Sequence, residues 1–208
     1  MKIQSPFEEK LNTLTHAFGA VLGVLGFVLL LYYNEQKTAW TTFSVVVYGI
    51  SVIVLFSASA LYHYVTEEKQ KRYLRIVDHI SIYLLIAGTY SPVLLISLKH
   101  SLGWELFFVV WGIAAFGLIL KLFFTGKFEL FSTLLYLVMG WLVVFDFSNL
   151  AEVIGEQGVY LLFAGGLFYT VGIIFYAFDR IPYNHVIWHL FVLAGAISHF
   201  LMIFLYVI

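Results

Sequence analysis

Long apolar segments interrupted by a few charged residues constrain this chain more than any other feature of its sequence. Hydrophobic residues make up 62% of the 208 positions and charged residues only 11%, whereas soluble globular domains carry about 25% charged residues. Several of the apolar segments reach the roughly 20 residues that a helix needs to cross a bilayer. The sequence therefore predicts an all-α, polytopic membrane protein.

The charged residues divide the chain into seven predicted transmembrane helices. We expect these spans at residues 17–33, 40–62, 77–98, 102–120, 129–147, 158–178 and 185–207. The connections between them are short, and the longest polar one covers residues 64–76. Residues 1–208 are thus expected to form a single seven-helix transmembrane bundle.

The positions of lysine and arginine predict how the bundle is oriented, because cationic loops are retained on the cytoplasmic side of the membrane. With the N-terminus inside, the outer segments carry only Lys37 and Lys99 of the 11 cationic residues. The inner segments carry Lys2, Lys10, Lys69, Lys71, Arg72, Arg75, Lys121, Lys127 and Arg180. We therefore expect an inner N-terminus and an outer C-terminus in the inner (plasma) membrane of the cell.

Composition also excludes several classes of partner and site. A net charge of −1 without a basic run argues against nucleic acid as a partner. The chain has no cysteine, so disulfides and thiolate metal sites are excluded. A metal ion would have to be bound by His, Asp or Glu.

Two histidines at the start of the last predicted span have the spacing of a metal site. His185 and His189 are four residues apart, so on a helix they lie one turn apart on the same face and both imidazoles can reach one ion. The alternative is that the pair anchors or packs the start of the helix without a metal. The positions of the other ionisable residues favour the metal.

The predicted topology brings five ionisable residues of three helices to one depth at the inner side: His63, Asp78, His79, His185 and His189. Ionisable groups within membrane spans usually have a function. Three neutral imidazoles and a water form the ligand set of a catalytic zinc ion. We assign His63, His185 and His189 as the metal ligands, with Zn²⁺ as the expected ion, although imidazole also suits other divalent metals.

Asp78 has two possible roles beside such a metal. It can act as the general base that takes a proton from the water, which is the role we favour, or it can be a fourth ligand or a hydrogen-bond partner of a ligand. Ser59 lies one turn before His63 on the same helix face, where its hydroxyl can hold a water or orient a ligand. Asp78 and Ser59 are therefore the predicted catalytic residues.

The remaining intramembrane histidines are expected outside the metal site. His79 points about 100° away from Asp78 around the helix, so we expect a structural role for it. His199 lies about 15 Å deeper than His189 by helical rise, and we expect it to be a buried hydrogen-bonding residue. His16, with Glu9 and Asn12 before it, enters the membrane from the same side as the metal site.

Three segments of the sequence together resemble the hemolysin III family of bacterial membrane proteins. They are SALYH at 59–63, VDHISIYLLIAGTYSP at 77–92 and HVIWHLFVLAGAISHF at 185–200. That family is similar to the progestin and adipoQ receptors, which include the adiponectin receptors, and to the alkaline ceramidases within a wider group of proposed membrane hydrolases. The resemblance implies a seven-helix bundle with zinc near the cytoplasmic side, held at His63, His185 and His189, and with Asp78 hydrogen-bonded to the metal-bound water.

Four functions are compatible with these features. The leading one is zinc-dependent intramembrane hydrolysis of an amide or ester in a membrane lipid, such as a ceramide or another acyl lipid. The second is a non-catalytic receptor or membrane-homeostasis factor with a structural zinc ion. The third is a cytolysin, although the spans contain no amphipathic stretch that would line a pore. The fourth is a haem protein with paired histidine ligands.

Overall fold

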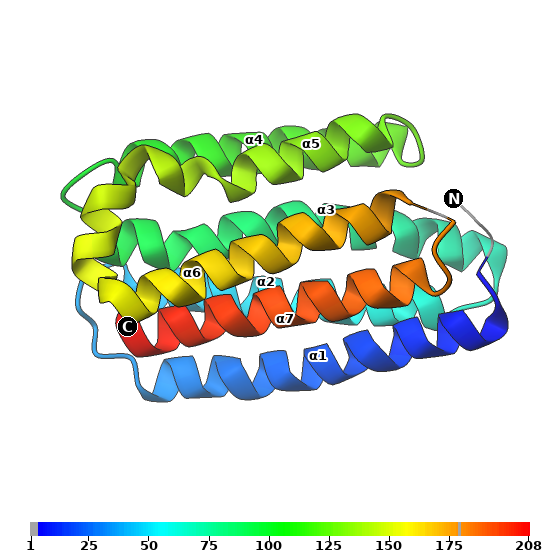
Figure 1. Ribbon diagram of the computed structural model, residues 1–208, viewed down its shortest axis with the longest axis horizontal. Helices are drawn as coiled ribbons and strands as arrows, with labels where there is room; N and C mark the ends of the chain where they lie inside the picture. The colour runs from blue at the N-terminus through cyan, green and yellow to red at the C-terminus, as the bar shows by residue number, and fades with distance from the viewer. Residues whose placement is uncertain (1–3, 179) are drawn as a thin grey trace.

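The computed structural model describes residues 4–178 and 180–208, and within these residues every regular element is a helix (Figure 1). The α-helices are α1 (Pro6–Tyr32), α2 (Thr41–Tyr64), α3 (Glu68–Pro92), α4 (Gly103–Phe124), α5 (Glu129–Gly140), α6 (Phe147–Ala177) and α7 (Asn184–Tyr206). A π-helical segment, η1 (Val93–Ser97), follows α3, and a 3-10 segment, η2 (Leu142–Asp146), follows α5. The predicted all-α class is confirmed.

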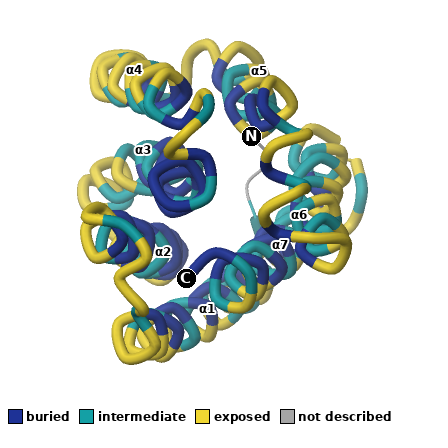
Figure 2. Tube along the Cα trace, turned by 90° about the vertical axis from the view of Figure 1, so that its left-hand side faces the viewer, coloured by how far each residue is buried: buried dark blue, intermediate teal, exposed yellow. Residues whose placement is uncertain are grey.

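The outer surface of the bundle is apolar, as expected for a protein whose solvent is lipid. Six segments of the described chain are long and apolar enough to cross a membrane. Large side chains such as Phe18, Val28, Phe116 and Phe123 are 51–74% exposed, and Figure 2 shows the buried positions turned toward the middle of the bundle. Helices suit this environment because each one satisfies its own backbone hydrogen bonds.

The fifth and sixth predicted spans are continuous in the structure rather than separated by a loop. One apolar segment of 49 residues, Glu129–Ala177, contains α5, η2 and α6. The chain reverses direction between α5 and the long part of α6 (Figure 1), and Gly155, with φ 67° and ψ 178°, interrupts α6 near its start. Only glycine adopts such a backbone conformation readily. The count of seven spans and the membrane side of each terminus stay predictions.

The polar segment 64–76, which was expected to connect two spans, is largely helical in the structure. Only residues 65–67 are non-helical, and α3 begins at Glu68. Glu67 caps this helix, because its carboxylate accepts hydrogen bonds from the main-chain N–H groups of Lys69 (2.9 Å) and Gln70 (3.0 Å). A capped charged helix satisfies its own backbone, so α3 extends beyond the apolar part of its span.

The two chain termini lie at opposite ends of the bundle. The N-terminus and the connections α2–α3, α4–α5 and α6–α7 lie at one end, whereas the C-terminus lies at the other (Figure 1). His63 is in the last turn of α2, Asp78 is in the first half of α3, and His185 is at the start of α7. All three residues are therefore near the end that carries the N-terminus.

Helix α1 packs closely on its neighbours through a row of glycines. Gly19, Gly23 and Gly26 are buried along one side of α1. A Cβ atom at Gly19 would lie 2.4 Å from Cδ1 of Phe56 in α2, and one at Gly26 would lie 2.9 Å from Cε2 of Phe200 in α7. Small residues of this kind let membrane helices approach closely. The middle and second half of α1 are thereby held against both helices that carry the predicted metal ligands.

Candidate metal centre

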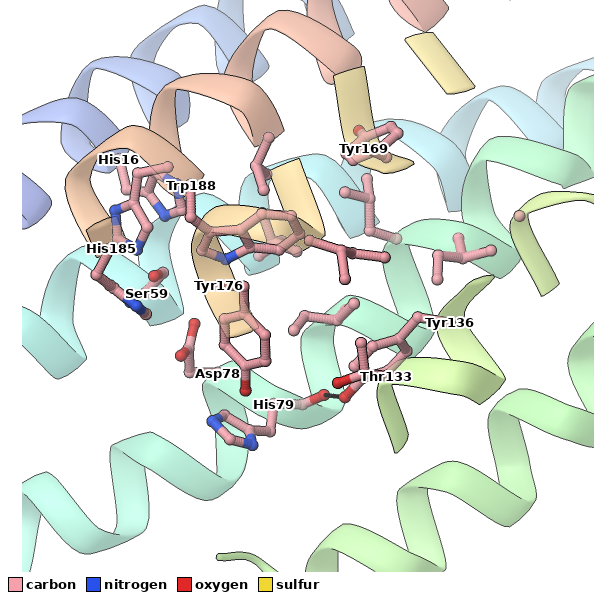
Figure 3. Close-up of a pocket in the computed structure, with 18 of the residues that line it drawn as sticks. His16, Ser59, Asp78, His79, Thr133, Tyr136, Tyr169, Tyr176, His185 and Trp188 are labelled. Carbon is pink, nitrogen blue, oxygen red and sulfur yellow. Dashed lines mark hydrogen bonds between the residues drawn. The ribbon is translucent and has the colours of Figure 1, made fainter. Parts of the chain in front are cut away.

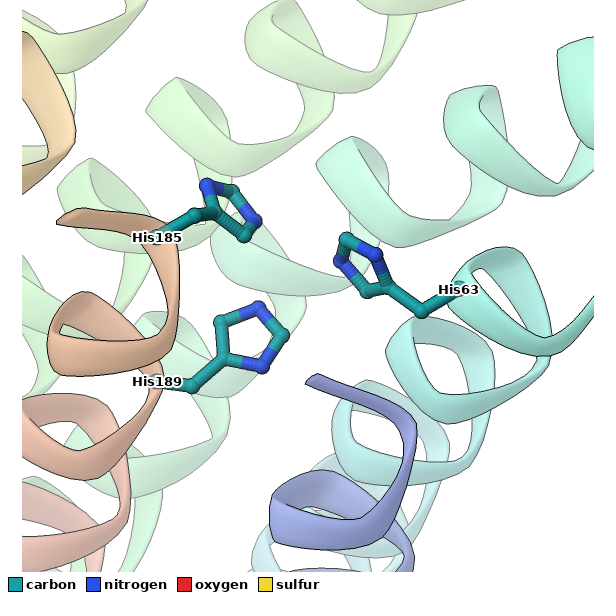
Figure 4. Close-up of side chains that lie close together, drawn as sticks. All are labelled: His63, His185 and His189. Atoms are coloured by element: carbon teal, nitrogen blue, oxygen red, sulfur yellow. The ribbon is translucent and has the colours of Figure 1, made fainter. Parts of the chain in front are cut away.

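The start of α7 places two histidines one turn apart, as their spacing predicts. The side-chain amide of Asn184 donates a hydrogen bond to the Phe175 carbonyl (3.0 Å), which joins the first residue of α7 to the end of α6. The rings of His185 and His189 have centroids 4.7 Å apart. Both rings point from α7 toward α2 (Figure 4).

His63, from the last turn of α2, completes a cluster with these two side chains. Its ring centroid lies 5.1 Å from that of His185 and 4.9 Å from that of His189. One ring nitrogen from each residue can be chosen so that all three lie within 4.8 Å of one another. The structure thus brings together the three histidines predicted as metal ligands, although their sequence positions are far apart.

The donor set and its surroundings fit a metal ion. Nε2 of His63 is buried and has no hydrogen-bond partner among the residues that the structure describes. A buried polar atom without a partner is costly, and a metal ion would satisfy this one. Three imidazoles suit Zn²⁺ and several other transition metals, and they leave a tetrahedral ion one open position.

Asp78 and Ser59 line the same cavity as the three histidines. Figure 3 shows both side chains in the cavity wall with His185. Ser59 is buried one turn before His63 on α2, and its side chain lines the cavity together with that of Asp78. Asp78 as a whole residue is partly buried, and it borders the cavity. Their catalytic roles stay predictions.

His79, the neighbour of Asp78, has its contacts with α5. Its Nδ1 lies 3.7 Å from Oε2 of Glu129, and its carbonyl accepts a hydrogen bond from the Tyr136 hydroxyl (3.2 Å). The adjacent Glu129 carboxylate also contacts Lys121 Nζ (2.9 Å) and Arg75 Nη2 (3.5 Å). This ion-pair cluster of Arg75, His79, Lys121 and Glu129 connects α3, α4 and α5 on another part of the cavity wall.

A fourth histidine lies against the cluster. The rings of His16 and His189 are stacked, with centroids 3.6 Å apart and planes at 13°. His16 is 3% exposed, and neither of its ring nitrogens has a hydrogen-bond partner among the described residues. The sequence places His16 on the same side of the membrane but not in this contact. The sequence feature that could have indicated this contact is the spacing of Glu9, Asn12 and His16, which lie on one face of α1.

The cavity extends well beyond the histidines. It has a volume of about 340 Å³ and adjoins a second cavity of about 290 Å³, because six residues line both. His199 is one of the shared residues, and its Nε2 lies 3.2 Å from the Leu162 carbonyl. Apolar side chains of the larger cavity include Leu55, Ile82, Leu85, Leu137, Ile173 and Val192. The space next to the cluster thus suits an apolar group.

Comparisons with known proteins agree with these features. The Haemolysin-III related family model matches residues 4–200. The chain is 42% identical to Hemolysin-3 of Bacillus cereus over 202 residues, which cover 97% of this chain and 92% of that protein. It is also 42% identical to the Hemolysin-3 homolog of Bacillus subtilis (strain 168) over 200 residues, covering 96% and 94% of the two chains.

A more distant similarity reaches animal proteins. The chain is 32% identical to the Monocyte to macrophage differentiation factor of Homo sapiens over 211 aligned positions, covering 96% of this chain and 84% of that one. No solved structure matches the chain.

Proposed function

This chain belongs to the Haemolysin-III related family, and from that membership and its histidine cluster we propose that it is a zinc-binding, multi-pass membrane hydrolase of a lipid amide or ester. The expected substrate is a ceramide-like or other acyl lipid. We expect the protein in the plasma membrane, with the metal site near the cytoplasmic side.

The histidine cluster is the observation that carries this proposal. Ligand atoms of His63, His185 and His189 lie within 4.8 Å of one another, and the cluster borders a cavity with a largely apolar wall. A partly buried acidic residue, Asp78, lines the same cavity. Metal ligands, a candidate base and space for an alkyl chain are the parts that hydrolysis of a lipid requires.

The residues of the cavity have different roles in the proposed reaction. His63, His185 and His189 would bind zinc as neutral imidazoles, and a bound zinc ion supplies a Lewis acid that polarises a carbonyl and acidifies water. The Asp78 carboxylate, oriented by the Ser59 hydroxyl, accepts a proton from the attacking water and returns it to the leaving amine or alcohol. The apolar wall binds the acyl chain and excludes bulk water.

Metal content provides the first test. Elemental analysis of the protein purified without chelators should give about one zinc per chain, since the described residues contain one such cluster. The His185→Ala/His189→Ala double variant should contain none. His199→Ala, on the same helix but away from the cluster, should keep the metal. Zinc-free wild-type protein would contradict the proposal.

Hydrolysis provides the second test. Purified protein in lipid bilayers should release fatty acid from one or more lipid amides or esters. Asp78→Asn should keep the zinc and lower the rate about 10²–10⁴-fold, which is the usual contribution of a general base. A variant that hydrolyses at the full rate would show that Asp78 is not the base.

A non-catalytic role is the second candidate, and one observation favours it. The proposed ligands come from α2 and α7, so a metal ion would join two helices that are far apart in sequence. A receptor or homeostasis factor with structural zinc would lose stability on chelation and yield no product from any lipid. Two relatives carry the name Hemolysin-3, so release of haemoglobin from erythrocytes tests a cytolytic role in the same preparations.

A further inference from the structure

The first turns of α1 contact two of the three clustered histidines through Nδ1. Nδ1 of His63 lies 2.6 Å from Oε2 of Glu9. Nδ1 of His189 lies 3.3 Å from the main-chain carbonyl oxygen of Asn12 and 3.4 Å from Oγ1 of Thr15. One face of α1 therefore supplies partners to ligands on both α2 and α7.

These partners determine which ring nitrogen carries the proton. The main-chain carbonyl of Asn12 can only accept a hydrogen bond, so Nδ1 of His189 is the donor. The Glu9 carboxylate faces two nitrogen atoms. Its Oε1 accepts a hydrogen bond from Lys71 Nζ (2.8 Å), and its Oε2 faces Nδ1 of His63. An ionised carboxylate satisfies both donors. Nδ1 of His63 is therefore a donor as well.

A protonated Nδ1 leaves the lone pair of a neutral imidazole on Nε2. For His63 this is the buried nitrogen that has no hydrogen-bond partner among the described residues. The side chain of His63 is only 2% exposed, and that of Glu9 is 25% exposed. The contact is thus largely shielded from solvent, and the other neutral tautomer would direct the Nδ1 lone pair of His63 at a carboxylate.

We propose that Glu9 is a positioning residue for the metal site: its carboxylate holds His63 in the tautomer and ring orientation that present Nε2 to the ion. The Asn12 carbonyl does the same for His189. The proposal rests on the zinc site of the proposed function. A carboxylate or carbonyl that accepts from the second nitrogen of a metal-binding histidine raises the basicity of the ligand and fixes its orientation.

Glu9 also connects helices, and this second role has to be separated from the first. Its ion pair with Lys71 joins α1 to α3, so a loss of metal on substitution could result from a shifted helix. Lys71→Met removes the ion pair and leaves the Glu9–His63 hydrogen bond. Glu9→Gln removes the negative charge and keeps the size of the side chain. Glu68→Gln, at an exposed position at the same end of the bundle, is the matched control.

The test is a zinc titration of chelator-treated, purified protein against a competing fluorescent chelator. We expect Glu9→Gln to bind one zinc with an affinity about 10–100-fold lower than that of the wild type, which is the usual effect of losing such a partner. Lys71→Met and Glu68→Gln should keep the wild-type affinity. If Glu9→Gln does not purify as a folded protein, Glu9→Asp, which retracts the carboxylate by one methylene group, should show a loss in the same direction.

Two results would overturn this role for Glu9. Glu9 variants with wild-type zinc affinity would remove it directly, and an equal loss in Lys71→Met would assign the effect to the connection between helices. Failure of the proposed function gives a different result, since the wild-type protein would then bind no zinc. Wild-type zinc binding with an unaffected Glu9→Gln variant overturns the inference alone.

Discussion

Removing the acidic partner of the ion pair between Lys121 and Glu129 should strongly destabilise the protein, because the cation of the pair is fully buried. The Lys121 side chain is 0% exposed, and its Nζ lies 2.9 Å from Oε2 of Glu129. Glu129→Gln would leave the ammonium group buried without its counter-ion. Removing one partner of a buried pair costs about 3–5 kcal/mol, and we expect the lower end, about 3 kcal/mol, because solvent screens partly exposed pairs. The Glu129 side chain is 29% exposed.

The matched substitution on the other side of the pair should be much milder. Lys121→Met removes the buried charge and keeps most of the side-chain volume, and Glu129 retains its contacts with Arg75 and His79. We expect a loss of about 1 kcal/mol or less, because apolar replacement of a buried ion is often close to neutral. The double variant should be more stable than Glu129→Gln alone, since it no longer contains an unpaired buried cation.

Thermal unfolding of the purified protein in detergent, with a chelator present to remove any contribution from metal, measures these effects. About 3 kcal/mol corresponds to a fall in Tm of about 6–12 °C for a chain of this size. A Glu129→Gln variant as stable as the wild type would refute the reasoning. So would a double variant whose loss equals the sum of the two single losses.

Three further predictions concern packing, metal and catalysis. Gly19→Ala should destabilise the protein by about 1–3 kcal/mol through overpacking against Phe56, whereas Gly112→Ala, whose new Cβ meets no atom within 4 Å, should not; equal Tm values would contradict this. Zinc at 100 times its dissociation constant should add about 2.7 kcal/mol of stability, which the His185→Ala/His189→Ala variant should lack in the same melting experiment. Ser59→Ala should lower the hydrolysis rate about fivefold, since the proposed orienting hydrogen bond to Asp78, about 1 kcal/mol, would be lost; an unchanged rate would exclude an orienting role for Ser59.

Much of the fold could be predicted from sequence because the signals are local. Apolar length identifies the helices, and the spacing of His185 and His189 places them one turn apart wherever their helix lies. The helix boundaries differ from those of the predicted spans where a local signal was ambiguous. Residues 68–76 are polar but form helix, because Glu67 caps them, and α5 and α6 follow each other with only η2 and a glycine interruption between their long parts.

The contacts around the metal site were less accessible to sequence reasoning. Alternating inner and outer loops require His63 and His185 to be near the same end of the bundle, and this topology was sufficient to select them. The stacking of His16 on His189 also depends on the rotation of α1 about its axis and on its close approach through Gly19. Neither quantity is set by the residues of α1 alone.

The sequence by itself determined an all-helical chain for an apolar solvent, its family and the residue types available to bind a metal. The tertiary structure alone decided the partners of those residues: Glu9 with His63, Asn12 with His189, and Lys121 with Glu129. The physical reason is that helix formation and apolar burial depend on neighbours along the chain, whereas a side-chain contact between helices depends on how the whole bundle packs.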